Sequence, residues 1–251
     1  MEWPGLGEIL PFIAIGFFAQ IIDGTLGMAF GVITSTLLLS MGVPPTAASA
    51  AVHAVKTATG AVGGTSHALA GNVDWRLLVR IAVPGALGGI LGAFLLSGIN
   101  PAVARPIVFA YLALLSVYIL LRALRGAIAL GQPRVVEPVG LAGGFLDAIG
   151  GGGWGPVVTS NLLAQGSQPR KTIGTVNLAE FFVTVAISAT FFGALSVEFH
   201  GAPVLGLLIG GVVAAPIGAL LVKRLPARPL MAAVGVILLA TSLFGLYRAL
   251  A

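Results

Sequence analysis

The chain alternates between long apolar stretches and short segments that hold most of its charged residues. An apolar stretch of about 20 residues is enough for a helix to cross the hydrocarbon core of a bilayer. The pattern therefore predicts an all-α polytopic membrane protein. The apolar stretches run over 9–40, 46–70, 78–98, 103–121, 138–165, 172–196, 202–222 and 230–247.

Glycines interrupt two of these stretches, at 22–31 and at 146–156, and the two interruptions occupy matching places in the two halves of the chain. Broken apolar segments in corresponding positions of two repeats are the best sequence pointer to a transporter binding site. A constant shift of 124 residues carries Asp23 onto Asp147, Gly27 onto Gly151, Gly31 onto Gly155, Gly42 onto Gly166 and Pro45 onto Pro169.

The composition agrees with a membrane protein. Hydrophobic residues make up 57% of the 251 residues and charged residues only 8%, where a soluble domain carries roughly 25% charge. The net charge of +5 comes mainly from loop Arg and Lys, which favours a topology signal over a nucleic-acid partner. No cysteine is present, so thiolate metal sites and disulfides are excluded. The first apolar stretch lacks the features of a cleaved signal peptide and is expected to be retained.

Loop charge indicates how the stretches cross. Eight single crossings would put the basic segments 122–134 and 170–171 on opposite sides, against the positive-inside tendency. The stretch 138–165 has 28 residues, whereas two full crossings need about 40, so it fits a hairpin of two short helices that enters and leaves on one side.

Applying the same interpretation to 9–40 gives two inverted repeats, 1–124 and 138–251, joined by a linker at 125–137. Each repeat is a re-entrant hairpin followed by three helices. The charged segment 122–137 is expected in the cytoplasm and both termini outside. The alternative is an eight-crossing protein with parallel halves.

The breaks are candidate anion sites. Half-helices that meet at membrane depth expose backbone N–H groups at their positive N-terminal ends, and glycine allows a ligand to approach the backbone closely. The alternative is that the glycines only let helices pack tightly. The candidate substrate-binding residues here are Gly24, Thr25, Gly27, Gly151, Gly152, Gly153 and Trp154.

Asp23 and Asp147 precede the two breaks. A carboxylate inside a membrane is costly and is a functional hypothesis by default, here in proton coupling. The alternative is that each caps the second half-helix through a side-chain oxygen.

Polar residues follow one face of the helix expected over 46–70, and the equivalent helix of the second repeat carries a similar stripe. The shift of 124 aligns His53 with Asn177 and Lys56 with Glu180. Three interpretations stay open: Lys56 and Glu180 form a structural ion pair, or Lys56 meets an anionic substrate while Glu180 handles protons or alternates as its partner, or one of them reaches an interface. His53 either relays protons or makes a helix–helix hydrogen bond.

Hydroxyl and amide groups complete this set. Thr57 and Asn177 are candidate hydrogen-bond donors to the substrate. Further hydroxyl and amide side chains follow the breaks at Thr34, Ser35, Thr36, Thr159, Ser160 and Asn161. In membranes such groups also bond to their own helix backbone.

Enzyme signatures are absent from the sequence. No G-x-S-x-G or H-E-x-x-H segment occurs, and His53, His67 and His200 are too scattered to form a metal set. The sequence predicts no enzyme activity and no cofactor.

The segment 144–156, with Asp147 followed by the Gly150–Gly153 run and Pro156, resembles the signature of the TauE/SafE sulfite exporter family. The stretch 169–177 is similar to that family's second signature, and 16–27 and 45–47 are their first-repeat counterparts. The resemblance covers essentially the whole chain. It implies a multi-pass permease of the bacterial inner membrane for small anions such as sulfite, sulfonates and related organic acids.

These observations together predict a secondary transporter that moves a small anion by alternating access, with proton coupling through Glu180, Asp23 or Asp147. The expected partners are the anion and the lipid bilayer, without nucleic acid, and a homo-oligomer is left open. The alternatives are a passive anion channel and a membrane scaffold that transports nothing.

Overall fold

The computed structural model describes residues 6–124, 131–195, 201–221 and 227–250. These residues form helices and connecting turns, without strands, so the expected all-helical fold is confirmed for the described part of the chain. Residues 125–130 of the expected linker and the basic segment 222–226 lie outside it. In chain order the helices are α1 Leu6–Leu26, α2 Phe30–Ser40, α3 Pro45–Leu69, α4 Trp75–Ser97, α5 Pro101–Leu124, α6 Glu137–Gly150, the π-helical turn η1 Gly155–Thr159, α7 Ser160–Ala164, α8 Pro169–Ala189, the π-helical turn η2 Thr190–Ala194, α9 Gly201–Leu221 and α10 Ala227–Leu250.

Five segments among the described residues are long and apolar enough to cross a bilayer. They are Gly7–Leu26, Trp75–Ser97, Pro101–Leu124, Pro169–Gly193 and Gly201–Leu221. The side chains that these helices turn outward include many large apolar ones, which suits contact with lipid rather than water.

The two glycine-interrupted segments are helical hairpins with a break between their arms. The first arm α1 ends before Gly27, and α6 ends at Gly150 and is followed by Gly151. Gly27 and Gly151 both have φ +68°, and their N–H groups bond to the carbonyls of Asp23 and Asp147, each at 2.6 Å. A left-handed glycine is the usual way to end a helix, so equivalent glycines end the first arm in both halves.

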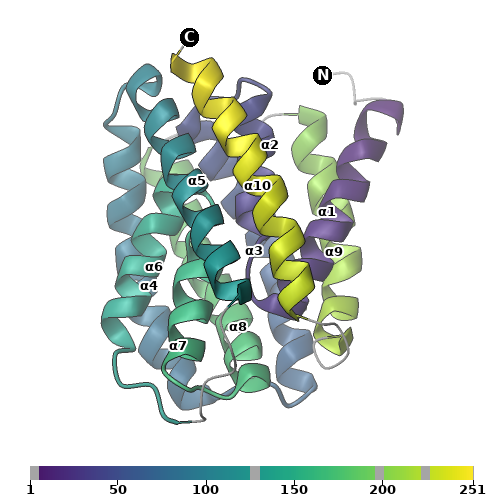
Figure 1. The fold of residues 1–251 in the computed structure, drawn as a ribbon, viewed down its shortest axis with the longest axis vertical. Coiled ribbons are helices and arrows are strands. Elements are labelled where there is room, and N and C mark those ends of the chain that lie inside the picture. The colour runs from purple at the N-terminus through teal and green to yellow at the C-terminus, as the bar shows by residue number, and fades with distance from the viewer. Residues whose placement is uncertain (1–5, 125–130, 196–200, 222–226, 251) are drawn as a thin grey trace.

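The helices pair across the two halves in a reciprocal pattern. The first arm α1 packs most extensively on α9, and its counterpart α6 packs on α4. The equivalent helices α3 and α8 pack on each other at the centre. The equivalent helices α5 and α10 also pack on each other, and they lie at the front in Figure 1. Each half therefore contributes the surface that covers the other half's hairpin.

Small residues make the close pairings feasible. A Cβ added to Gly24 in α1 would lie 2.8 Å from the Cα of Gly218 in α9. A Cβ at Gly16 would lie 2.5 Å from the carbonyl oxygen of Leu207. Small-residue contacts of this kind drive helix association in lipid, where apolar side chains gain nothing by leaving the membrane.

The second hairpin begins and ends at the same end of the bundle. Gly131 N–H donates to Gly166 O at 2.8 Å, and Arg134 N–H donates to the side chain of Gln165 at 2.8 Å. The opposite end holds the turn after α2, where the Arg105 side chain donates to Gly42 O at 2.5 Å. In Figure 1, α1 begins and α10 ends at the upper end, whereas the segment leading into α6 lies at the lower end.

These placements agree with two hairpins that approach each other from opposite ends. The division into inverted repeats stays a prediction.

Candidate functional site

Asp23 and Asp147 perform the same backbone task in the two hairpins. Asp147 Oδ1 accepts the N–H of Trp154 at 3.0 Å, and Asp23 Oδ1 accepts the N–H of Phe30 at 3.2 Å. In both cases the donor lies seven residues ahead, at or next to the first residue of the second half-helix. Each aspartate thus caps a positive helix end, which has backbone N–H groups without helical partners.

Lys56 brings the two halves together at the centre. Its ammonium donates to both carboxylate oxygens of Asp147, at 3.1 and 3.2 Å, and lies 2.6 Å from Glu180 Oε1. The three residues come from α3, α6 and α8, and they are buried, with Lys56 only 3% exposed. Charges held away from water are stable only when they are paired and hydrogen-bonded. Lys56 and Glu180, which the 124-residue shift relates, therefore form an ion pair.

His53 adds a second donor to Asp147. Its Nε2 lies 3.0 Å from Asp147 Oδ2, and its Nδ1 lies 2.7 Å from the backbone oxygen of Ser49. The Ser49 hydroxyl lies 3.3 Å from the same Nδ1, so Ser49 faces this ring nitrogen with its hydroxyl as well as its backbone oxygen. His53 thus makes a contact between α3 and the second hairpin.

Ser49 secures this contact from the other side. Its hydroxyl donates to Ala148 O at 2.5 Å, next to Asp147 in α6. The sequence analysis did not select Ser49. Its position one turn before His53 is the only signal that the sequence offers, and the shift of 124 places Ile173 at the equivalent site.

The tips of the two hairpins touch, backbone against backbone. A Cβ at Gly31 would collide with Gly151 O, and a Cβ at Gly155 would collide with Gly27 O. Thr159 bridges the same gap, because its hydroxyl donates to Gly27 O at 2.7 Å. Gly27, Gly31, Gly151 and Gly155 therefore serve the close approach of the two breaks, and Gly152, whose Cβ would meet Val32, does the same.

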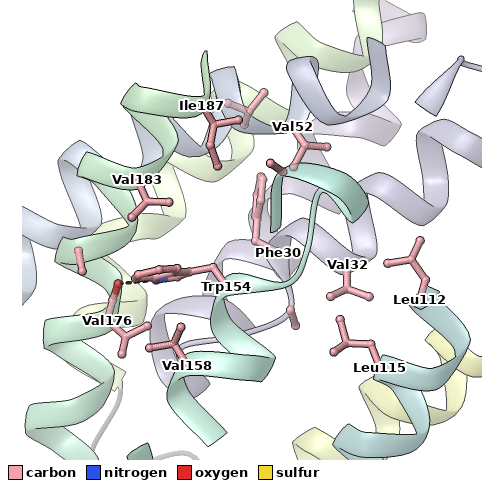
Figure 2. Packing of buried hydrophobic residues seen from close by; sticks show 14 of the residues in the cluster. Phe30, Val32, Val52, Leu112, Leu115, Trp154, Val158, Val176, Val183 and Ile187 are labelled. Atoms are coloured by element: carbon pink, nitrogen blue, oxygen red, sulfur yellow. Dashed lines mark hydrogen bonds between the residues drawn. The ribbon is translucent and has the colours of Figure 1, made fainter. Parts of the chain in front are cut away.

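An aromatic residue lies at the start of the second half-helix of each hairpin and anchors the hairpin tip against a neighbouring helix. The Trp154 indole is fully buried, donates from Nε1 to Val176 O at 3.1 Å, and lies beside Val176 and Val183 of α8 (Figure 2). Phe30 is the equivalent residue, and its ring would lie 3.4 Å from a Cβ at Gly211. Trp154 was expected among the substrate-binding residues; the structure places its ring in the packed core.

The other sequence-selected donors bond within their own helices. Thr25 donates to Ile21 O at 2.8 Å, Thr57 to His53 O at 2.8 Å, and Asn177 to Ile173 O at 3.0 Å. Thr57 also lies 3.3 Å from the Ser188 hydroxyl. The structure thus does not join Thr25 and Thr57 to the Lys56 cluster by a hydrogen bond.

Gly24 and Gly153 occupy positions different from the tip contact. Gly24 lies inside α1 and packs against α9. The first break therefore begins three residues after Gly24, at Gly27. Gly153 lies against Tyr111 of α5, whose hydroxyl would be 2.6 Å from an added Cβ. The Tyr111 hydroxyl is buried without a hydrogen-bond partner in the described structure. Nothing in the sequence distinguishes this tyrosine, because its neighbours are those of an ordinary apolar helix.

No metal site is evident among the residues that the structure describes: no three His, Asp or Glu side chains are grouped to hold an ion. The chemistry on offer is one buried ammonium, one imidazole and three carboxylates at the point where both hairpins and both central helices converge. Such an arrangement can exchange a carboxylate partner of Lys56 for another anion.

The comparisons with known proteins agree with this picture. A family profile described as Sulfite exporter TauE/SafE matches residues 12–245. The chain is 41% identical over 227 residues to "Probable membrane transporter protein YtnM" of Bacillus subtilis (strain 168), covering 86% of this chain and 75% of that protein. It is 32% identical over 137 residues to "Sulfite exporter TauE/SafE family protein 3" of Arabidopsis thaliana, covering 54% of this chain and 27% of that protein. No solved structure matches the chain significantly.

Proposed function

The chain belongs to the TauE/SafE sulfite exporter family, and from this premise we propose that it carries a small anion past Lys56. The family is one of membrane transporters rather than enzymes. The proposed substrates are sulfite, a sulfonate such as sulfoacetate, or a related organic acid. The proposed location is the bacterial inner membrane.

A single observation carries the proposal: a buried ammonium lies between the two halves of the molecule. Lys56 Nζ contacts Asp147 of the second hairpin and Glu180 of the second central helix. A lysine this deep in an apolar chain is expensive to keep unless it has a functional partner. An oxyanion has the charge and the acceptor geometry to replace one of the two carboxylates.

Replacement of a carboxylate requires a proton. If an anion joins the cluster while Asp147 and Glu180 both stay ionised, the buried site gains uncompensated negative charge, which low polarity penalises strongly. A proton on Glu180 releases its hold on Lys56 and cancels the added charge. The anion and the proton then bind together: the proton binds to Glu180, and the anion takes the place of the Glu180 carboxylate beside Lys56.

Alternating access would follow from movement of one half against the other around this point. The tips meet backbone against backbone at Gly31, Gly151 and Gly155, so movement of one half against the other would change this contact directly. Transporters built from repeats with broken helices work by rocking of this kind around a fixed site. The proposed orientation places the end with Arg134 and Lys171 in the cytoplasm and both termini outside.

The proposal is tested by thermal unfolding of the purified chain with sulfite, sulfate, thiosulfate, sulfoacetate, acetate and chloride. A ligand that binds only the folded state stabilises it by about 2.7 kcal/mol at 100 times its Kd. We expect a selective shift for one class of anion, its loss in Lys56→Ala, and its retention in Lys171→Ala. A shift that survives in Lys56→Ala would remove the lysine from the site.

Flux in proteoliposomes separates the remaining functions. A transporter shows saturation and exchange of labelled for unlabelled anion across the membrane. Flux that rises linearly with concentration would favour a passive channel with the same fold. Absence of both binding and flux for the whole panel would favour a scaffold.

A further inference from the structure

We infer that Asp23 carries a proton in this state and forms a proton-binding site separate from the Lys56–Glu180 pair. The protonation itself is independent of transport, whereas its use in transport rests on the proposed function. The inference comes from the unequal surroundings of two residues, Asp23 and Asp147, that are otherwise equivalent in the two hairpins.

Asp147 has a full set of donors. Its two oxygens receive the Lys56 ammonium, the His53 ring at 3.0 Å and the N–H of Trp154 at 3.0 Å. The Lys56 ammonium is cationic, and hydrogen bonds to ionised groups are roughly twice as strong as those between neutral groups. Asp147 is therefore held as a carboxylate although it is fully buried.

Asp23 has almost none of these donors. It is 4% exposed, and within the described residues its side chain accepts one hydrogen bond, from Phe30 N–H, and forms no ion pair. At the position equivalent to Lys56 the second central helix carries Glu180, and at the position equivalent to His53 it carries Asn177. A carboxyl group without a cationic partner in an apolar interior is much cheaper to keep neutral than ionised.

The charge balance of the cluster points the same way. Lys56 supplies one positive charge, and the carboxyl groups of Asp147 and Glu180 already contact it. An ionised Asp23 would add a further negative charge to this buried centre, with no ion pair of its own among the described residues. A protonated Asp23 adds none.

Among the described side chains, the charged groups that act on Asp23 are Lys56 and the like-charged Asp147. The described parts of α2 and α9 hold no ionisable side chain. His67 of α3 is paired through Nδ1 with Asn72, and the ionisable side chains that the structure describes in α10, Tyr247 and Arg248, lie near its C-terminal end.

Release of this proton would have a structural consequence. The O–H bond of Asp23 breaks, the proton passes to water, and the carboxylate that remains attracts Lys56 away from Asp147 and Glu180. Because Asp23 also caps α2 through Phe30, the charge appears at the tip of the first hairpin. Proton release thus moves the pairing of Lys56 from the second hairpin toward the first.

The test is infrared difference spectroscopy of the purified full-length chain at neutral pH. The chain has only eight Asp and Glu residues, so a protonated-carboxyl C=O band that shifts in heavy water can be assigned by substitution. We expect the band in the wild type and in Glu8→Gln, an exposed acid of α1, and its loss in Asp23→Asn. Asparagine keeps an oxygen that accepts the Phe30 N–H, so this variant retains the cap.

Two results would overturn the inference. One is absence of the band in the wild type, which means that every carboxyl group is ionised. The other is a band that persists in Asp23→Asn and disappears in Glu180→Gln, which places the proton on Glu180. The spectrum is measured without any anion, so it stands even if no anion of the panel binds and the proposed function fails.

Uptake into proteoliposomes tests the use of the proton. Anion flux driven by an imposed pH gradient is expected to rise several-fold in the wild type and in Glu8→Gln. In Asp23→Asn this response is expected to be lost. A response of wild-type size in Asp23→Asn would leave the proton site without a part in coupling.

Discussion

Lys56 and Glu180, which the 124-residue shift places at equivalent positions of the two halves, lie 2.6 Å apart between Nζ and Oε1. Positions that the shift relates thus meet between α3 and α8, which pack on each other. One half supplies the cation there and the other half supplies the carboxylate. The two related positions therefore differ in the charge that they carry and form an ion pair because of it.

Removal of Lys56 should destabilise the protein more than removal of its partner Glu180. Lys56→Met leaves Asp147 and Glu180 buried without a lysine, and breaking a buried ion pair from one side costs about 3–5 kcal/mol. In Glu180→Gln the ammonium keeps Asp147, so we expect a smaller loss of about 1–3 kcal/mol. Unfolding of the detergent-solubilised variants measures both, with Lys171→Met as the control.

An equal loss in the two variants would contradict this order. It would mean that Glu180, rather than Asp147, is the main counter-ion of Lys56. A loss in Lys171→Met of the same size would show that the effect is not specific to the buried cluster.

The helices and the breaks could be predicted from the sequence because each depends on local pattern. Apolar length marks the helices, and the shared spacing of Asp23, Gly27 and Gly31 with their counterparts marks the breaks. The first break was expected within 22–31, and the structure begins it only after Leu26, the last residue of α1. Gly24 is tolerated inside the helix because α9 packs against it, and a single sequence does not reveal such a neighbour.

The partners within the site were harder to predict. Lys56 and Glu180 were found because lysine and glutamate are rare inside apolar helices. Ser49 and Tyr111 were not, since their importance arises from the contact with the second hairpin. Thr25 and Thr57 were selected by residue type, and in the structure they bond to their own helices.

The contact between the hairpin tips should not tolerate a methyl group. A Cβ at Gly155 would collide with Gly27 O, and overpacking of a tight contact typically costs about 1–3 kcal/mol. We expect Gly155→Ala to lower the free energy of unfolding by that amount. Gly7→Ala is the matched control, because nothing lies within 4 Å of its added Cβ and the residue is in a helix. Equal stability of the two variants would show that the tips move apart freely.

Ala29 is expected to be a site where glycine stabilises the protein. It has φ 115° and ψ −28° just before α2, a conformation that a residue with a Cβ rarely adopts. Such strain costs about 1–3 kcal/mol, while the extra freedom of glycine in the unfolded chain costs about 0.4–1 kcal/mol. Ala29→Gly should therefore raise the free energy of unfolding by about 1 kcal/mol.

The control for this prediction is an alanine in ordinary helical geometry. Ala14 is exposed inside α1, and Ala14→Gly should lower stability by about 1 kcal/mol. Opposite signs for the two alanine-to-glycine changes are the diagnostic result. Destabilisation by Ala29→Gly would show that the first break is not strained.

The crossing pattern itself can be tested with single cysteines, because the natural chain contains none and gives no background labelling. Arg134 and Lys171 flank the two ends of the second hairpin, where Gly131 bonds to Gly166, so cysteines at both positions should face the cytoplasm. Asn100, between α4 and α5, should face outward. An impermeant maleimide should label Asn100→Cys in intact cells, and Arg134→Cys and Lys171→Cys only in inverted vesicles. Labelling of residues 134 and 171 from opposite sides would exclude the re-entrant hairpin, and with it the inverted repeats on which the rocking of the two halves around Lys56 depends.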